Sequence, residues 1–295
     1  MAIGVAYRRH IRQGTRSRSP VGETGGVTNI VIRRASDRFT SSEPGVTSRH
    51  SFSFGRHYDP ENVGFGLLIM NNDDVVEPGH GYPTHPHRDV EIVTWVLDGA
   101  LVHRDTTGAG GVIHPGLAQR LSAGRGVRHS EFNDHRPSPL RFVQMWVPPD
   151  SAGADPSYGC QDVSEDLDSG GLVTVASGMP RYSGSTAITL GQRAAAMHVA
   201  RLSRQPAPVE RGGGDARAHS VTLPTAPFLH LYVARGTADV EGVGRLGEGD
   251  AVRIIDEGGR RVTAAPSDSD AAEPGPAAGF AEIISWEMHA DLRPA

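Results

Sequence analysis

Short apolar runs, separated by residues that favour turns, recur along most of the chain. In the first half these runs lie at 29–33, 51–55, 64–70, 90–97, 111–114 and 140–147. After a gap they resume at 172–176, 187–190, 197–202, 228–234, 251–255 and 281–287. Runs of this length bounded by Gly, Pro, Asn and Asp are typical of β-strands, and the polar clusters at 71–74 and 77–79 predict loops. The pattern predicts an all-β protein built from two successive β units.

The segments outside these runs divide the chain into parts. The first 20 residues carry five arginines and no acidic residue, and they lack the apolar stretch of a secretory signal. Residues 151–171 are acidic and rich in turn-forming residues, which is typical of a linker. We therefore expect a flexible basic tail at 1–28, a first β unit at 29–150, a linker at 151–171 and a second β unit at 172–295.

The composition supports this view and excludes several functions. The 37 glycines and 21 prolines favour many short strands joined by turns over long helices. A net charge of −5 argues against direct binding of nucleic acid, and no apolar run approaches the ~18 residues that span a membrane. The chain has no lysine, which excludes Schiff-base, pyridoxal-phosphate and P-loop chemistry. Cys160 stands alone, so an internal disulfide is impossible, and we expect a cytoplasmic protein.

Two short motifs carry the candidate chemistry. His85-Pro86-His87 is followed 42 residues later by His129-Ser130-Glu131. Alternate residues of a β-strand point to the same face, so an H-x-H and an H-x-E on strands can direct three imidazoles and one carboxylate into one space. Such a set suits a divalent transition metal, with coordination positions left open for a substrate. Because the set has no thiolate, nickel, copper, zinc, manganese and iron all remain open.

The sequence around these motifs resembles the cupin superfamily and, within it, the pirin family. The stretches HPHRDVEIVTWVLDGALVHRDTTGAGGVIHPG and LSAGRGVRHSEF closely resemble the signature stretches of pirins. The close resemblance covers about residues 27–150, whereas the second half is similar only loosely, through HLYVARGTADVEGVGRLGEGDAVRI. The proline that usually precedes Gly126 in the second cupin motif is missing, and Ala123 and Gly124 stand there instead. The resemblance implies two tandem cupin barrels, the N-terminal one binding a metal and the C-terminal one degenerate.

The pirin resemblance implies a set of metal ligands: His85, His87, His129 and Glu131. It also implies that the metal is iron. The general cupin pattern offers another candidate for the carboxylate ligand, Glu91, four residues beyond His87. The alternation of side chains along a strand does not decide between Glu91 and Glu131, because a β-bulge can shift it. Following the family pattern, we select Glu131 as both ligand and catalytic base, and we expect Glu91 to support the site or the fold from behind.

The resemblance further implies dioxygenase activity on flavonols such as quercetin. The 3-hydroxyl of the flavonol would bind at the metal and lose its proton to Glu131, and dioxygen would then open the ring with loss of carbon monoxide. The expected partners are therefore a small apolar aromatic substrate and O2. Six apolar residues on the predicted strands are candidates for the lining of the mouth of the site: Phe52, Phe54, Phe65, Leu67, Ile69 and Met145.

Two other functions remain open. Some pirins are implicated as metal-dependent partners of transcription factors or metabolic enzymes, so a redox-dependent regulatory protein with a protein partner is the main alternative. Zinc-dependent isomerisation of a sugar phosphate ranks third. It would need basic residues at the mouth, and Arg88, Arg125 and Arg128 lie near the motifs.

The other histidines receive structural interpretations. His103 lies in the family signature on the strand after the first motif, and we expect it to be a structural hydrogen-bonding residue. No pairing pattern surrounds the remaining histidines of the first β unit, which are His50, His57, His80, His114 and His135. In the second half His198, His219 and His230 form no H-x-H pair, so we expect a single metal site.

Overall fold

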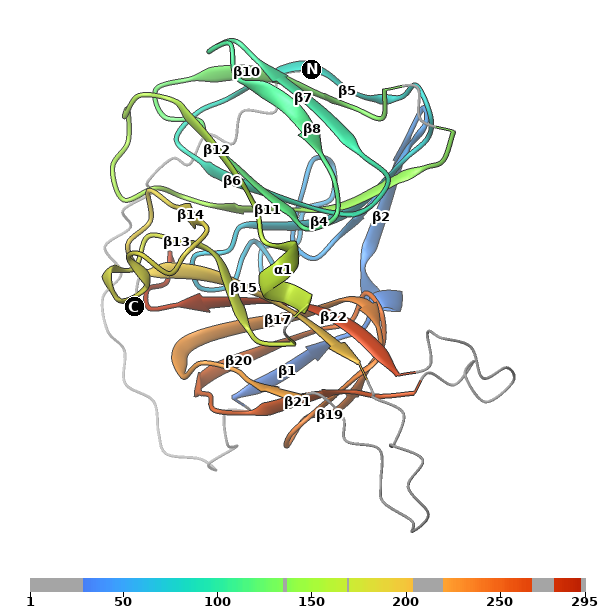
Figure 1. Cartoon of the computed structure of the whole chain (residues 1–295), viewed down its shortest axis with the longest axis vertical. Coiled ribbons are helices and arrows are strands. Elements are labelled where there is room, and N and C mark those ends of the chain that lie inside the picture. Colours follow the sequence, from blue (N-terminus) through green and yellow to red (C-terminus); the bar gives the residue numbers. More distant parts are fainter. Residues whose placement is uncertain (1–28, 135–136, 169, 204–219, 267–278, 293–295) are drawn as a thin grey trace, which may run out of the picture.

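The computed structural model of this chain describes residues 29–134, 137–168, 170–203, 220–266 and 279–292. Within these residues almost every element is a β-strand, which confirms the predicted fold class. The strands form four sheets, and Figure 1 shows them as four layers, with one large and one small sheet in each half of the molecule. The described part contains no helix long and apolar enough to cross a membrane. The predicted basic tail, His135 and His219 lie outside the described residues.

The N-terminal half forms one barrel from two antiparallel sheets. Its large sheet has the strand order β12-β9-β6-β11-β4-β3-β2, and its small sheet has the order β5-β10-β7-β8. The strands are β2 (Phe39–Glu43), β3 (Val46–His50), β4 (Met70–Val76), β5 (Gly81–His87), β6 (Glu91–Asp98), β7 (Leu101–Asp105), β8 (Gly110–Ile113), β9 (Leu117–Ser122), β10 (Val127–Phe132), β11 (Leu140–Val147) and β12 (Ser157–Asp162). Val96, Leu101 and Phe142 belong to the apolar core that fills this barrel between its two sheets.

The C-terminal half repeats this architecture. Its large sheet has the order β1-β20-β17-β22-β15-β13-β14, and its small sheet has the order β16-β21-β18-β19. The strands are β1 (Ile30–Arg33), β13 (Val173–Ser177), β14 (Ile188–Thr189), β15 (Ala195–Ser203), β16 (Ser220–Thr222), β17 (Ala226–Gly236), β18 (Ala238–Val240), β19 (Gly244–Leu246), β20 (Ala251–Glu257), β21 (Arg261–Ala264) and β22 (Phe280–Met288). The short helices are η1 (Ala35–Asp37), α1 (Ser164–Asp168) and η2 (Pro180–Tyr182).

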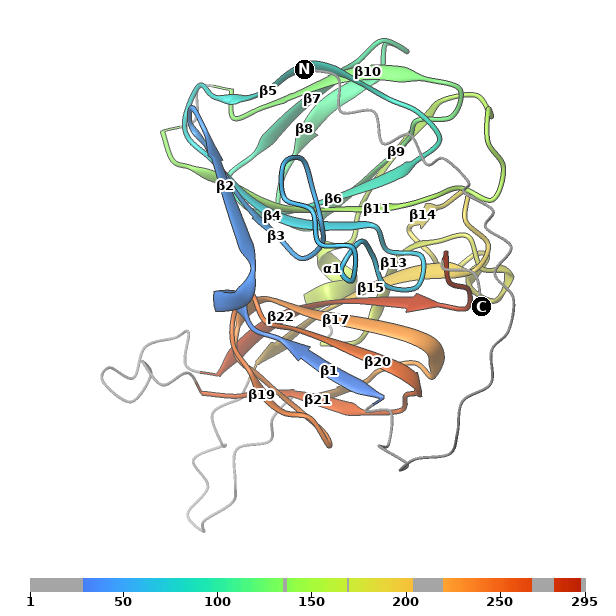
Figure 2. The same cartoon turned by 180° about the vertical axis from the view of Figure 1, so that it is seen from behind.

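The two barrels pack through the outer faces of their large sheets, as the two opposite views in Figures 1 and 2 show. Because side chains alternate along a strand, β6 directs Ile92 and Val96 into its own barrel and Trp95 towards the other barrel. The Nε1 of Trp95 donates a 2.6 Å hydrogen bond to Glu282, and Trp286 returns a 3.2 Å contact to the sulfur of Met145. The central strands β6 and β11 of the large N-terminal sheet are therefore buried on both faces, and their sequences are largely apolar.

The strand pairing differs from the predicted division of the chain at two places. β1, directly after the tail, pairs with β20 of the C-terminal sheet, with Ile30 opposite Ile254. β12, inside the segment expected to be a linker, pairs with β9 of the N-terminal sheet. Each strand fills the same edge position in sheets of matching order. Hydrophobic periodicity identifies a strand but not the sheet edge that it joins, because that edge is made by residues distant in the sequence.

Residues 71–74 were predicted to be a loop and instead belong to β4, an interior strand of the large N-terminal sheet. Their polar side chains are buried, and the two carboxylates accept hydrogen bonds from other strands, which lowers the cost of burying them. Arg141 donates to both oxygens of Asp73 at 3.0 and 2.8 Å, and the hydroxyl of Tyr82 donates to Asp74 at 3.0 Å. These partners lie far away in the sequence, so composition alone pointed to the wrong element.

The apolar runs at 51–55 and 64–70 were predicted to be strands, and both are loops that hold only isolated bridges before β4 begins. Phe52 and Phe65 are nevertheless buried in the core between the barrels. Gly66 has φ = 56°, and a side chain there would lie 3.0 Å from the Cβ of Phe228. The runs are apolar because this loop is covered by the second barrel.

Candidate metal centre

The two histidine motifs lie on neighbouring strands of the small N-terminal sheet. β5 carries His85 and His87, β10 carries His129, and His129 lies opposite His85 in the antiparallel register. Along β10 Val127, His129 and Glu131 are buried, whereas Arg128 is exposed. The alternation predicted for H-x-E is therefore present, and it directs His129 and Glu131 into the barrel.

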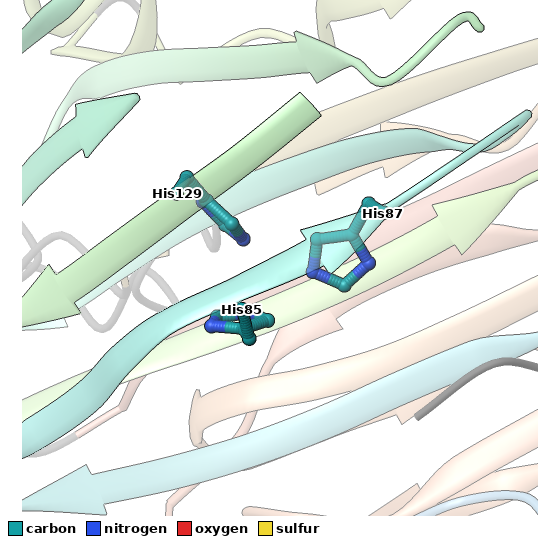
Figure 3. A group of neighbouring side chains, drawn as sticks. All are labelled: His85, His87 and His129. Carbon is teal, nitrogen blue, oxygen red and sulfur yellow. The ribbon is translucent and has the colours of Figure 1, made fainter. Parts of the chain in front are cut away.

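The three imidazoles converge on one space. Figure 3 shows the rings of His85, His87 and His129 facing one another, and their centroids are separated by 4.5–4.8 Å. One nitrogen from each ring lies within 4.8 Å of the others. The Nε2 atoms of His87 and His129 are buried and have no hydrogen-bond partner, whereas Nδ1 of His85 lies 2.9 Å from the carbonyl oxygen of Pro83. Unpaired buried nitrogens are costly unless something binds them, and a metal ion fits this donor set.

The electrostatic environment keeps the imidazoles of His87 and His129 neutral. Burial, together with the neighbouring His129 and His85, lowers the pKa of His87 to about 3. Burial also lowers the pKa of His129 to about 3, with His85 and His103 as the next causes. A metal binds the neutral form of imidazole, so the rings of His87 and His129 are in the form that can coordinate a metal at neutral pH.

Glu131 lies at the edge of this group and not within it. Its carboxylate forms a second set of potential ligands with His129 and His103, so His129 is common to both sets. The side-chain amide of Gln144 donates to both oxygens of Glu131 at 3.0 Å, and the Nε1 of Trp146 donates to the carbonyl oxygen of Gln144 at 3.1 Å. The amide orientation of Gln144 is thereby set, with its amino group towards Glu131.

The position of Glu131 has a local cause in the backbone. The pairing of β10 with β5 shifts register between His129 and Glu131. At Gly81 a side chain would place its Cβ 2.1 Å from the carbonyl oxygen of Glu131, so only glycine allows this approach of the strands. Strand parity alone therefore does not place the carboxylate.

His103 is a hydrogen-bonding residue, as expected from the sequence, and one of its partners is the candidate ligand His129. Its Nδ1 lies 3.3 Å from Nδ1 of His129, and its Nε2 lies 3.4 Å from a carboxylate oxygen of Asp105. The ring of Tyr158, on the unexpected strand β12, lies 5.1 Å away. The alternating pair His103 and Asp105 in the sequence was the available signal, since both side chains face the barrel.

Glu91, the rival carboxylate, lies away from the histidines. It accepts hydrogen bonds from the hydroxyl of Ser122 at 2.8 Å and from the backbone amide of Gly191 in the C-terminal half at 2.9 Å. It is almost completely buried. Glu91 therefore joins the two halves, in agreement with the structural role expected for it.

Only part of the predicted mouth surrounds the histidines. Phe54 and Ile69 pack with Trp146, whose ring lies 5.0 Å from that of His87 and 5.9 Å from that of Phe54. The other four candidates lie in the core between the barrels, so the expectation was wrong for Phe52, Phe65, Leu67 and Met145. Sequence parity could not separate the two faces, because three of these four residues lie in loops.

The arginines considered for phosphate binding have other partners. Arg125 forms an ion pair with Asp155, and Arg128 donates to the backbone carbonyl of Thr84 at 3.3 Å. Arg88 is exposed. The structure offers no grouped cations at the histidines among these three residues.

The C-terminal barrel contains buried histidines of a different kind. Within the described part of the chain, both groups of potential metal ligands lie in the N-terminal barrel. Both nitrogens of His198 are used, Nδ1 with the hydroxyl of Thr174 and Nε2 with the carboxylate of Glu287, each at 3.1 Å. Neither nitrogen of His230 has a partner, but no other potential ligand is grouped with it.

Comparisons with known proteins agree with the fold and the motifs. The sequence profile of the pirin family matches residues 32–147. A Mycobacterium tuberculosis protein, provisionally named as a quercetin 2,3-dioxygenase, is 50% identical over 263 residues, which cover 89% of this chain and 96% of that protein. The quercetin 2,3-dioxygenase of Escherichia coli is 42% identical over 129 residues, 44% of this chain and 56% of that protein.

A solved structure is similar over most of the chain. The bacterial pirin YhhW from Escherichia coli, in complex with nickel(II), superposes with a TM-score of 0.69 at 26% identity, covering 88% of this chain and 99% of that one. The two barrels place the protein in the class of proteins with two cupin barrels, and the sequence matches identify the family within that class. The chain belongs to the pirin family.

Proposed function

We propose that this pirin is a metal-dependent dioxygenase that opens the ring of flavonols such as quercetin. The observation that carries the proposal is the convergence of three imidazoles, two of which, His87 and His129, have buried Nε2 atoms without a protein partner. The names of the relatives from Mycobacterium tuberculosis and Escherichia coli support the reaction class. The nickel(II) complex of YhhW supports a divalent metal.

The proposed ligands are His85, His87, His129 and Glu131, and the proposed resident metal is iron. Imidazole and carboxylate ligands suit iron, nickel, copper, zinc and manganese alike, so the donor set leaves nickel as the first alternative. When bound, the metal would polarise the flavonol hydroxyl and bring the substrate and dioxygen together.

Glu131 is the proposed base for the 3-hydroxyl of the flavonol. It is buried, so its carboxylate acts in a site that excludes bulk water, where charge interactions are strong. Gln144 supplies one amino group to two carboxylate oxygens, which leaves acceptor capacity on both. That free capacity allows Glu131 to take a proton while its orientation is maintained.

Trp146 and Phe54 are the proposed surface for a planar aromatic substrate. Trp146 packs edge-on against His87, and Phe54 packs edge-on against Trp146, which forms an aromatic wall beside the imidazoles. Aromatic side chains bind flat rings through large contact area with defined geometry. Ile92 and Leu121 lie behind this wall and keep water away from it.

Oxygen uptake with a flavonol tests the proposal directly. Metal-free protein is reloaded with Fe(II) or Ni(II), and both O2 consumption and carbon monoxide release are measured with quercetin. Glu131→Gln removes the base without changing its size, so we expect a loss of at least about 10²-fold in turnover, typical for a general base. Glu91→Gln is the matched control, because Glu91 is also a buried carboxylate but bonds only away from the histidines.

The outcomes separate the hypotheses. Uptake that continues at the same rate after metal removal, or equal rates for Glu131→Gln and Glu91→Gln, would contradict the proposal. Firm metal binding at His85, His87 and His129 without any oxygen uptake would favour the regulatory alternative.

A further inference from the structure

A chain of hydrogen bonds runs from the candidate ligand His129 to a carboxylate on the neighbouring hairpin. Nδ1 of His129 lies 3.3 Å from Nδ1 of His103, and Nε2 of His103 lies 3.4 Å from Oδ2 of Asp105. The side chains of His103 and Asp105 are both completely buried.

Asp105 is held firmly as an acceptor. Its other oxygen, Oδ1, accepts hydrogen bonds from the backbone amide of Thr107 at 2.8 Å, the hydroxyl of Thr107 at 2.6 Å and the backbone amide of Ala109 at 3.2 Å. These bonds belong to the turn between β7 and β8. The orientation of the carboxylate is therefore determined by the backbone, and Oδ2 faces His103.

This anchor determines where each proton lies. A carboxylate oxygen can only accept, so Nε2 of His103 must carry the hydrogen. A neutral imidazole has one N–H, so Nδ1 of His103 is an acceptor and Nδ1 of His129 must donate to it. The other nitrogen of His129, Nε2, then carries no hydrogen, and its lone pair is free to bind a metal. This nitrogen is the buried atom that has no protein partner and faces His85 and His87.

We propose that His103 and Asp105 are positioning residues that hold His129 in the one tautomer able to bind the metal. The inference rests on the metal site of the proposed function and assigns to these two residues a role that the ligand set does not include. Partners of this kind orient a ligand imidazole and increase its basicity, and their loss typically weakens metal binding. His85 is oriented by a carbonyl of the backbone, so no substitution removes its partner, and the chain to His129 is the one open to test.

Asp105→Asn reverses the chain without changing its shape. The asparagine carbonyl must face the amides of Thr107 and Ala109, because a flipped side chain would place its amino group against those N–H groups. The amino group then faces Nε2 of His103 and makes it an acceptor. His103 must donate from Nδ1, and His129 must accept on Nδ1 and carry its hydrogen on Nε2, where the metal would bind. Asp105→Ala, in contrast, removes the carboxylate, so the rings of His103 and His129 can adopt either tautomer.

The two variants distinguish positioning from a merely structural role. Affinity for Ni(II) is measured by competition with a chelator, and thermal unfolding is measured on the same samples. We expect Asp105→Asn to weaken nickel binding by about 10- to 100-fold and to do so more than Asp105→Ala. We expect the opposite order for stability, since alanine loses the bonds of the turn. A structural role predicts that alanine is the more harmful variant in both measurements, and that result would overturn the proposal.

A spectroscopic measurement tests the inference without any metal. Nitrogen-15 chemical shifts of the histidine rings report the tautomer in the metal-free protein. We expect hydrogen on Nδ1 of His129 in the wild type and on Nε2 in Asp105→Asn. If the spectra show the hydrogen of wild-type His129 on Nε2, the inference is wrong, regardless of the measured nickel affinity. The expected tautomer without any nickel binding would instead count against the metal site of the proposed function.

Discussion

The two barrels of this protein share a strand order but differ in what their interiors contain. In each half a seven-stranded sheet faces a four-stranded sheet, and the strands occupy matching positions, down to the edge strands β12 and β1. The small N-terminal sheet presents His85 and His129 to the interior. At the matching strands of the C-terminal barrel, Val221 and Val262 face inwards and belong to the apolar core. One architecture therefore supports a polar site in one copy and a closed core in the other.

The buried polar groups of the two barrels also differ in how they are partnered. Glu287 in the C-terminal barrel is completely buried and uses both oxygens, with Tyr182 at 2.7 Å, His198 at 3.1 Å, His289 at 2.7 Å and an ion pair to Arg181. In the N-terminal barrel the Nε2 atoms of His87 and His129 have no partner. A cluster whose lone pairs are all used stabilises the fold, whereas convergent unused lone pairs indicate a ligand.

Unpaired buried nitrogens indicate a ligand only where several of them point into one space. His230 has two buried nitrogens without partners, yet it lies among Phe52, Phe65 and the guanidinium of Arg253. A buried imidazole without hydrogen-bond partners has a cost in free energy, and His230 has no second ligand beside it with which to share a metal. The comparison therefore predicts different consequences for substitution at each kind of histidine.

The largest effect is expected for a ligand of the N-terminal barrel. His129→Ala removes the imidazole that lies 4.5 Å from His85 and 4.8 Å from His87 between ring centroids, so we expect loss of bound metal and of metal-dependent oxygen uptake. His198→Ala, at a buried histidine of the C-terminal barrel, should lower stability but leave the metal content of the folded protein unchanged. Metal analysis of both purified variants checks the contrast. Equal metal content would remove the distinction between the two barrels.

The next effect concerns stability. Glu287→Ala leaves His198 and Tyr182 without their acceptor inside the C-terminal barrel. Removing one partner of a buried pair typically costs 3–5 kcal/mol, and because Arg181 is half exposed we expect a decrease of about 3 kcal/mol in the free energy of unfolding. Urea unfolding of the metal-free protein measures it.

Glu248→Ala is the control for that variant, since Glu248 pairs with Arg141 at the surface. Exposed ion pairs contribute little, so its effect should stay below about 1 kcal/mol. Equal losses in the two variants would show that the cluster around Glu287 does not support the closed barrel.

The smallest expected effect is a change in pH dependence. Burial, together with the charges of Arg253 and Arg38, lowers the pKa of His230 to about 3. Below its unfolded pKa of 6.5 the unfolded chain binds a proton at this residue that the folded chain does not bind, so folding weakens as the pH falls from 6.5 towards 3. His230→Phe removes this term. Between pH 6.5 and pH 5 the metal-free wild type should lose about 2 kcal/mol more stability than the variant.

Urea unfolding at the two pH values checks this prediction. The exposed His114 provides the control, and His114→Phe should lose as much stability between these pH values as the wild type. An unchanged pH dependence in His230→Phe would mean that the ring of His230 is protonated or hydrated in the folded state.

Much of the candidate site was accessible from local sequence. The spacing of His85 and His87, and of His129 and Glu131, needs only the two-residue repeat of a strand to place each pair on one face. The long-range partners were not accessible. Gln144 approaches Glu131 from the opposite sheet, and Asp73 is satisfied by Arg141, 68 residues away. Local pattern could not indicate that a run of asparagines and aspartates forms an interior strand.

By itself, the sequence determined the β class, the family, the three convergent histidines and the absence of lysine chemistry. Each of these depends on residue type and short spacing, which the chain carries wherever it folds. The tertiary structure alone decided that β1 joins the second barrel, that Glu131 rests against Gln144, and that His103 and Asp105 stand behind His129. These features depend on which strands become neighbours and on which buried polar atoms remain to be paired, and both are settled only when distant segments pack together.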